Sequence, residues 1–288
     1  MELRVLRYFL MAAREENITK AAKLLHITQP TLSRQLMQLE EELGVKLFHR
    51  GKYHIVLTEE GMLLRRRAQE MIELEEKTKR EFSKEEAELA GEIAIGCGET
   101  RNMTFLSQKM AQFRQEHPLI RYDVYSAIAD DIKERMEKGI LDLALLMEPV
   151  DIAKYEFVRM PEKEQWGVLV REDSPLASLE AVSPEDLIGQ PILNAKREIV
   201  QNELANWFGD AYDKIEIAAT YNLILNASNM VRNGVGAALC FRLDNQYDGL
   251  RFVPLEPKLE TGAVLAWKKN QTFSQTSSRF IDFIKHSF

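Results

Sequence analysis

Residues 18–61 read ITKAAKLLHITQPTLSRQLMQLEEELGVKLFHRGKYHIVLTEEG and decide the fold of the N-terminal part of the chain. Two short helices are predicted here. Thr28 suits the N-cap of the second, because its hydroxyl can accept a backbone N–H of the first turn. Pro30 fits that same turn, where its missing N–H costs nothing. Leucines then recur at spacings of four, three and four, which predicts one buried helix face. They are Leu32, Leu36, Leu39 and Leu43.

The opposite face of this second helix carries a high density of polar side chains. Flat amides, short hydroxyls and a guanidinium suit the hydrogen-bonding edges of bases in a major groove, and a helix start suits phosphate. The pattern favours a DNA-reading helix-turn-helix over an amphipathic helix pair whose polar face only meets water. The predicted DNA contacts on this helix are Thr28, Gln29, Pro30, Thr31, Ser33, Arg34 and Gln35.

A hairpin is predicted directly after this helix. Gly44 suits the helix C-terminus, where glycine readily adopts a left-handed conformation. The segment VKLFHRGKYHIVLT (45–58) then alternates as two strands do, with Gly51 and Lys52 at the tip. We expect Arg50 and Lys52 to contact the phosphate backbone or the minor groove. Residues 1–58 are thus predicted to form an all-α, winged helix-turn-helix domain.

This stretch resembles the N-terminal signature of LysR-type transcriptional regulators. The match runs without a gap from Ala21 to Gly61. The resemblance implies a sequence-specific regulator that binds double-stranded promoter or operator DNA, assembles as a homodimer or homotetramer, and responds to a small-molecule effector. RNA polymerase is a further partner compatible with that role. The matching positions are Gln29-Pro30, Ser33-Arg34, Leu39-Glu40, Leu43-Gly44, Leu47-Phe48, Arg50, Leu57-Thr58 and Gly61.

Length and composition point to a folded protein of the cytoplasm. A chain of 288 residues has room for two or three domains, and a hydrophobic content of 45% supports folded cores. Met1 leads straight into an amphipathic helix, and no apolar run approaches the length that crosses a membrane. Two cysteines argue against a disulfide framework and suit a reducing compartment. We therefore expect a cytoplasmic location.

The net charge of −7 is distributed unevenly. Residues 1–58 hold nine Lys or Arg against six Asp or Glu, whereas residues 59–90 hold seven against ten. The rest of the chain holds 22 against 29 and would repel a polyanion. This distribution excludes a non-specific nucleic-acid coat protein and confines DNA binding to the first domain.

Residues 59–90 are predicted to form a long linker helix. The segment contains no proline, and a four-three spacing gives an imperfect coiled-coil seam. A solvated helical spacer is the alternative, since two glutamates interrupt the seam. The resemblance implies that this is a dimerising linker, with Leu64, Met71 and Phe82 on the seam.

From residue 91 onward, strands and helices alternate. This order suggests two open α/β lobes, with lobe I formed by residues 91–160 and 266–288 and lobe II by residues 161–265. The resemblance implies a periplasmic-binding-protein-like effector domain. The alternative function is a metabolite-binding or enzymatic α/β protein whose N-terminal domain serves only assembly.

Ligands of open α/β sheets collect beyond the carboxyl ends of strands, where helix starts also point. After the first strand, Thr100 and Asn102 are predicted to form a helix-start pocket for a carboxylate. Glu99 places a negative charge beside it, which either selects a cationic or amide-bearing effector or pairs with Arg101. The predicted effector contacts are Gly98, Glu99, Thr100, Asn102, Ser126, Ile128, Met147, Ala195, Lys196 and Asn222.

No arrangement of residues predicts catalysis. No nucleophile–base pair stands out, and the five histidines lack the spacing of metal ligands. We therefore expect no catalytic residue, no metal and no cofactor. Cys97 and Cys240 could form a redox switch, but both end apolar strands, so buried, unreactive thiols are the preferred interpretation.

Overall fold

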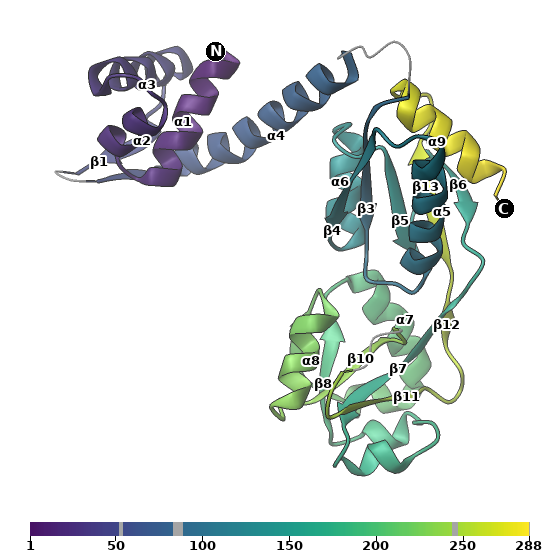
Figure 1. Cartoon of the computed structure of the whole chain (residues 1–288). Coiled ribbons are helices and arrows are strands. Elements are labelled where there is room, and N and C mark those ends of the chain that lie inside the picture. The colour runs from purple at the N-terminus through teal and green to yellow at the C-terminus, as the bar shows by residue number, and fades with distance from the viewer. Residues whose placement is uncertain (52–53, 83–88, 244–246, 288) are drawn as a thin grey trace. The chain divides into compact units, whose positions relative to one another are not determined.

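A computed structural model describes residues 1–51, 54–82, 89–243 and 247–287. The chain divides into two compact units, Met1–Lys84 and Glu85–Phe288, which are described separately (Figure 1).

The first unit is a winged helix-turn-helix followed by a long helix. Leu32, Leu36 and Leu39 are fully buried, as their spacing predicted. Leu43 differs from the expectation: it ends its helix and remains 38% exposed. Gly44 follows in the left-handed conformation (φ 71°) that closes the helix. The elements are α1 (Leu3–Glu15), α2 (Ile18–Leu24), α3 (Gln29–Leu43), β1 (Phe48–Arg50), β2 (Ile55–Leu57) and α4 (Glu59–Phe82).

The start of α4 is joined closely to the wing. The Thr58 hydroxyl donates to the Lys46 carbonyl at 2.6 Å and accepts the backbone N–H of Gly61 at 2.9 Å. A Cβ at Gly61 would lie 2.2 Å from the carbonyl oxygen of Leu47, so only glycine permits this approach. The wing, its preceding loop and the first turn of α4 therefore form one packed junction.

The predicted dimer seam of α4 packs largely within its own unit. Ala68 is fully buried there, and Leu64 and Met71 lie partly buried against the same core as α1. Further along, the Arg7 guanidinium of α1 contacts the carboxylates of Glu75 and Glu76, each at 2.9 Å. The apolar stripe of α4 that was predicted as a dimer seam thus packs against α1 of the same chain. Phe82 ends α4, and its side chain lies outside the described residues.

Lobe I of the second unit is a mixed sheet in the order β4-β3-β5-β13-β6. The first three strands are parallel, whereas β13 runs antiparallel to both its neighbours. Apolar side chains of α5 and α9 cover one face, and those of α6 cover the other. The elements are β3 (Gly91–Cys97), α5 (Asn102–Glu116), β4 (Ile120–Ser126), α6 (Ala129–Glu137), β5 (Leu143–Met147), β6 (Tyr155–Arg159), β13 (Ala263–Lys268) and α9 (Gln275–Lys285).

Lobe II is a second mixed sheet in the order β11-β7-β10-β8-β9, with β12 paired to β7. Helix α7 packs on one face and α8 on the other. The helices and strands are β7 (Glu164–Arg171), β8 (Pro191–Ala195), α7 (Glu198–Phe208), β9 (Glu216–Tyr221), α8 (Ile224–Arg232), β10 (Ala237–Phe241), β11 (Leu250–Pro254) and β12 (Glu260–Thr261). Three 3₁₀ turns, Pro175–Ser178, Glu185–Leu187 and Gly209–Lys214, complete it.

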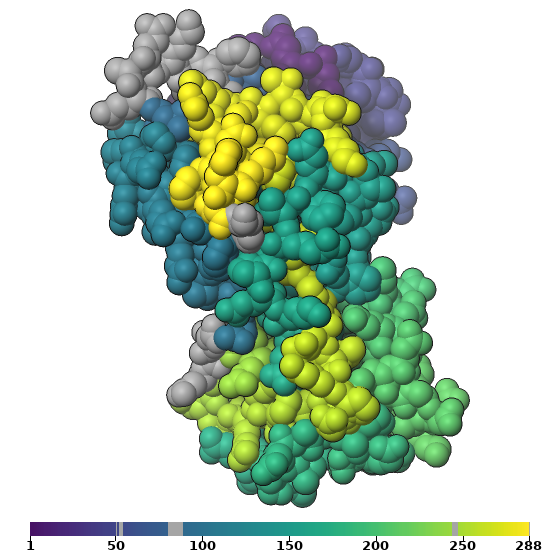
Figure 2. Space-filling view, turned by 90° about the vertical axis from the view of Figure 1, so that its right-hand side faces the viewer, coloured from purple at the N-terminus to yellow at the C-terminus, as the bar shows by residue number. Residues whose placement is uncertain are grey.

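The chain crosses twice between the lobes. The first crossing lies between β6 and β7, and the second between β12 and β13. The expected boundary at residue 265 falls inside β13, which begins at Ala263 and lies wholly in the lobe I sheet. The C-terminal helix α9 returns to lobe I, as Figure 2 shows in yellow. The antiparallel strands β6 and β11 were not predicted.

Candidate functional site

The start of α3 is held by two threonines. The Thr28 hydroxyl accepts the backbone N–H of Thr31 at 3.4 Å and lies 2.8 Å from the Thr31 hydroxyl. Pro30 occupies the first turn, as predicted. Both threonine side chains are exposed. The helix start therefore presents two hydroxyls to solvent, while the Thr28 cap satisfies the Thr31 N–H and Pro30 has none.

The polar face of α3 is open. Gln29, Pro30 and Arg34 are exposed, while Ser33 and Gln35 are half-buried at its edges. Gln35 donates from its amide to the Gln38 amide oxygen at 3.1 Å, which fixes its orientation. Within the described part of the chain, Arg34 has no ion-pair partner. Its guanidinium is available to a base edge or a phosphate.

Glu40 links α3 to the wing. Its buried carboxylate accepts the backbone N–H groups of Leu47 at 2.9 Å and Phe48 at 3.3 Å, and the Lys46 ammonium lies 3.1 Å away. Burial would raise the pKa of Glu40, but these donors outweigh it and hold the pKa below its ordinary value. The recognition helix and the wing are thereby fixed to each other. Sequence reasoning assigned Glu40 no role beyond the family signature.

The wing is a two-stranded antiparallel hairpin. Arg50 pairs with Ile55, and the Gly51 N–H donates to the His54 carbonyl at 2.9 Å. The side chain of Arg50 and the whole of Lys52 lie outside the described residues. The expected hairpin is present, while the two basic contacts stay predictions.

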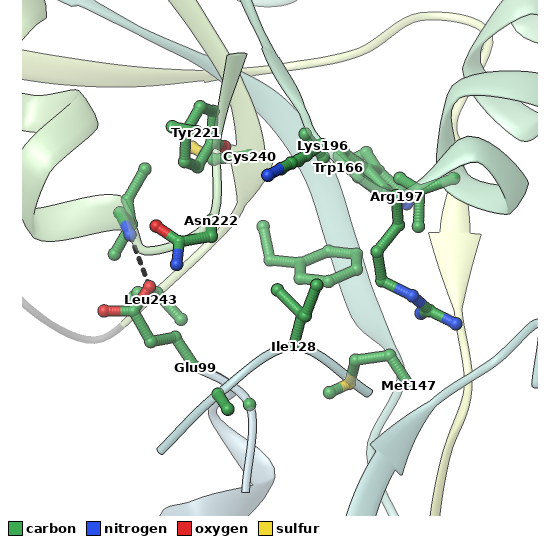
Figure 3. Close-up of a pocket in the computed structure, with 16 residues that line it drawn as sticks. Glu99, Ile128, Met147, Trp166, Lys196, Arg197, Tyr221, Asn222, Cys240 and Leu243 are labelled. Carbon is green, nitrogen blue, oxygen red and sulfur yellow. Dashed lines mark hydrogen bonds between the residues drawn. The ribbon is translucent and has the colours of Figure 1, made fainter. Parts of the chain in front are cut away.

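A cavity of about 120 Å³ lies between the two lobes of the second unit (Figure 3). Most of the predicted effector residues surround it, because parallel strands of both sheets end there. Seven predicted residues line this cavity: Gly98, Glu99, Ile128, Met147, Ala195, Lys196 and Asn222. The other lining residues are Ala127, Trp166, Arg197, Val200, Tyr221, Ile224, Cys240, Phe241 and Leu243.

Thr100 and Asn102 lie outside this cavity, because Glu164 already occupies the start of α5. The buried Glu164 carboxylate accepts the Thr100 hydroxyl and, at 2.6 Å, the Asn102 side-chain amide. It also accepts the backbone N–H groups of Asn102 at 3.3 Å and Arg101 at 3.4 Å. The predicted carboxylate pocket thus exists, but its carboxylate comes from the protein. Ser126 borders a neighbouring hollow with Thr100.

Glu99 occupies the start of α8 in a similar way. Its carboxylate, on lobe I, accepts the backbone N–H of Ile224, the first residue of that lobe II helix. Burial raises the pKa of Glu99, and this hydrogen bond offsets part of the rise. The sequence also allowed an ion pair between Glu99 and Arg101. In the structure the Arg101 guanidinium instead lies 3.8 Å from the Glu162 carboxylate.

The aromatic wall of the cavity was missed by sequence reasoning. The Trp166 indole packs 4.3 Å, centroid to centroid, from the Phe241 ring, and its N–H donates to the Thr261 hydroxyl at 2.8 Å. Phe241 ends β10, so the strand-end rule could have found it. Trp166 lies on β7, which runs antiparallel, where that rule does not apply. Burial raises the pKa of both Cys97 and Cys240 to about 12, in keeping with unreactive thiols.

Comparison with known proteins accounts for both units. Residues 3–62 match the model of the bacterial regulatory helix-turn-helix proteins of the lysR family, and residues 86–288 match the LysR substrate binding domain. The chain belongs to the LysR family. LysR-family regulators bind DNA and control transcription through an effector-binding domain, and this chain is such a regulator.

Similar proteins are spread over several bacteria. The Hca operon transcriptional activator HcaR of Escherichia coli is 29% identical, with 94% of this chain and 93% of HcaR covered. The LysR-family regulator HinK of Pseudomonas aeruginosa is 26% identical, with a TM-score of 0.57 and 99% and 98% coverage. CbnR bound to its target DNA shares the fold, with a TM-score of 0.78 at 19% identity and full coverage of both chains.

The known LysR-family relatives are regulators of transcription and not enzymes. In the part of this LysR chain that the structure describes, no helix has the length and apolar character needed to span a membrane. Nor do His, Cys, Asp or Glu side chains there form a group of three or more suited to a metal ion.

Proposed function

We propose that the polar face of α3 reads operator bases in the major groove. The observation that carries the proposal is the exposed Arg34, which has no ion-pair partner among the described residues, beside the exposed Gln29 at a capped helix start. Arginine and glutamine recognise guanine and adenine edges by paired hydrogen bonds. Thr28 and Thr31 add contacts to phosphate or base, and Arg50 and Lys52 of the wing follow the backbone.

The experiment is a DNA-binding titration of Arg34→Ala on operator fragments selected by the wild-type protein. Loss of a base contact should weaken specific binding by about 1–3 kcal/mol and relax preference at one base position. Arg251→Ala, an exposed arginine of lobe II, is the matched control and should leave binding unchanged. Unchanged affinity and base preference in Arg34→Ala would place another face of α3 on the DNA.

The cavity between the lobes is the proposed effector site. Small-molecule sites are concave and mostly apolar, with a few polar groups that fix orientation. Here Trp166, Phe241 and Val200 supply the apolar wall, while Glu99 and Lys196 supply charge. Effector binding is proposed to alter DNA binding of the whole assembly in the cytoplasm, without catalysis by this chain. Contact with RNA polymerase would follow at the promoter.

A homodimer formed through α4 is proposed, on a surface different from the predicted seam. Because Leu64 and Met71 face their own unit, the apolar side chains exposed on the described part of α4 include Met62, Leu63 and Leu74, and we choose Leu63 and Leu74, which are 55% and 43% exposed. They lie eleven positions apart, three helical turns, and so share one face. The partner is a second copy, since regulators of this class bind paired half-sites as dimers. Two such dimers would give a tetramer.

Light scattering of Leu63→Asp/Leu74→Asp tests this surface. The double variant should be monomeric and should lose palindromic-site binding, because two buried charges oppose the contact. Glu59→Asp/Glu60→Asp, a conservative change in the same helix, is the control. A stable dimer in the leucine variant would assign dimerisation to another surface.

A further inference from the structure

Two unlike charges line the effector cavity without neutralising each other. Glu99 extends from the end of β3 in lobe I, and Lys196 follows β8 in lobe II. Among the residues that the structure describes, neither forms an ion pair with the other or with a third side chain. Figure 3 shows them on either side of Asn222. Each charge is therefore available to a bound molecule.

Arg197 differs from Lys196 although both line the cavity. Its guanidinium Nε lies 3.4 Å from the Asp130 carboxylate across the cleft, and only 11% of its side chain is exposed. Arg197 thus links the lobes and is already compensated. Among the described lining residues, Lys196 is the cation left for an effector anion.

Two of the helix starts at the cleft, those of α5 and α8, are closed to an effector anion. Glu164 occupies the start of α5 through four donors, and Glu99 occupies the start of α8. A ligand carboxylate at either place would meet a carboxylate of the protein at close range, where like charges repel. An anionic group is therefore directed to the side of the cavity where Lys196 precedes the start of α7. A hydrogen-bond donor is directed to Glu99, whose burial leaves its charge poorly compensated.

The remaining volume suits one ring. A cavity near 150 Å³ accommodates benzene, so this one, at about 120 Å³ and open to the cleft, limits the buried apolar part of an effector to about one ring. Trp166 and Phe241 form its apolar wall. On the basis of the proposed effector site, we propose that Glu99 and Lys196 together select a small amphoteric effector. Such a molecule carries an apolar, ring-sized body, an anionic group toward Lys196, and an ammonium or comparable donor toward Glu99.

Calorimetric titration of the full-length protein with three matched probes tests the proposal. Benzoate carries the anion alone, benzylamine carries the ammonium alone, and 4-(aminomethyl)benzoate carries both. The amphoteric probe should bind at least about tenfold more tightly than either of the others, since each charge-assisted contact contributes to affinity. Equal affinities for the three probes, or no binding of any at millimolar concentration, would overturn the proposal.

Three variants separate the contributions. Glu99→Gln keeps an oxygen for the Ile224 N–H and removes only the charge, so it should lower affinity for the two amines about tenfold and spare benzoate. Lys196→Gln should lower affinity for the two carboxylates, benzoate and 4-(aminomethyl)benzoate, and spare benzylamine. Glu180→Gln, an exposed glutamate of lobe II, is the control. If Glu99→Gln behaves like this control, Glu99 does not select the effector.

Ala195→Phe tests the cavity itself. The added ring fills the space at the end of β8 and should abolish binding of every probe, with folding checked by circular dichroism. If binding survives this variant, the probes bind elsewhere and the proposed effector site fails. If Ala195→Phe abolishes binding while Glu99→Gln changes nothing, the cavity stands and only the charge selection fails.

Discussion

Two of the helix starts at the cleft, those of α5 and α8, are each occupied by a glutamate of the opposite lobe. At α5, Glu164 is fully buried and accepts four hydrogen bonds. At α8, Glu99 is half-buried and accepts one backbone N–H. The Glu164 carboxylate already accepts the donors at the start of α5, so an effector anion cannot bind there. The Glu99 carboxylate, by contrast, lies beside an open cavity. The same local interaction is thus structural in one place and accessible to ligand in the other.

The largest expected effect is on Glu164. Glu164→Ala removes an acceptor shared by four donors. The two donors of Asn102 keep the Thr100 hydroxyl and the Glu162 carbonyl, but the Thr100 hydroxyl and the Arg101 N–H lose this acceptor, and each donor left unsatisfied costs about 1–3 kcal/mol. We expect the effector unit to lose at least about 3 kcal/mol of unfolding free energy, measured by urea denaturation. Glu162→Ala, its exposed neighbour, should change stability little. If Glu164→Ala lowers the unfolding free energy less than Glu99→Ala does, the carboxylate at the start of α5 is not the more structural of the two.

A smaller effect is expected at Thr100. Thr100→Val keeps the shape but leaves Glu164 with one donor fewer, at a cost of about 1–3 kcal/mol of stability. Affinity for the effector probes should stay unchanged, because the hydroxyl points to Glu164 and not into the cavity. Thr104→Val, exposed on the same helix, is the control. Weaker probe binding with normal stability would return Thr100 to the ligand site.

The smallest effect concerns pH. The pKa of Glu99 is raised by burial, so its contribution to stability is present below its unfolded pKa and is lost as the pH rises through the folded pKa. Glu40 has a lowered pKa, so its contribution is present above the unfolded pKa and is lost as the pH falls through the folded one. Urea denaturation of Glu99→Gln and Glu40→Gln across acid to neutral pH should show opposite slopes relative to wild type. Slopes of the same sign would contradict these assignments.

Local patterns were predictable from sequence, and long-range partners were not. The cap at Thr28 and the leucine stripe of α3 depend on residues within a few positions of one another, so they could be identified directly. Glu164 lies 62 positions from Asn102, and nothing near either residue signals their contact. The stripe on α4 likewise predicted a buried face correctly, but an apolar spacing cannot tell an intrachain core from a partner helix.

The cleft followed the same division. Strand-end reasoning placed Gly98, Ile128 and Asn222 at one cavity because parallel strands end on a common edge. It failed for Trp166, which lies on a strand that enters the sheet in the opposite direction. The second crossover was predicted a few residues too late for a related reason. β13 pairs with strands that lie more than 100 positions earlier in the chain, so its lobe cannot be read from its neighbours in sequence.

The junction among Thr58, Gly61 and the wing gives α4 the mechanics of a lever arm. With 24 residues, α4 extends roughly 36 Å from that junction at 1.5 Å per residue. A tilt of about 10° at its base would sweep the far end through roughly 6 Å over that length. Because the wing holds the base of α4 and Arg7 of α1 holds Glu75 and Glu76 further along, α4 turns together with the recognition helix when its far end is displaced. Small motions at the far end of α4 can therefore change the direction in which the recognition helix faces its operator half-site.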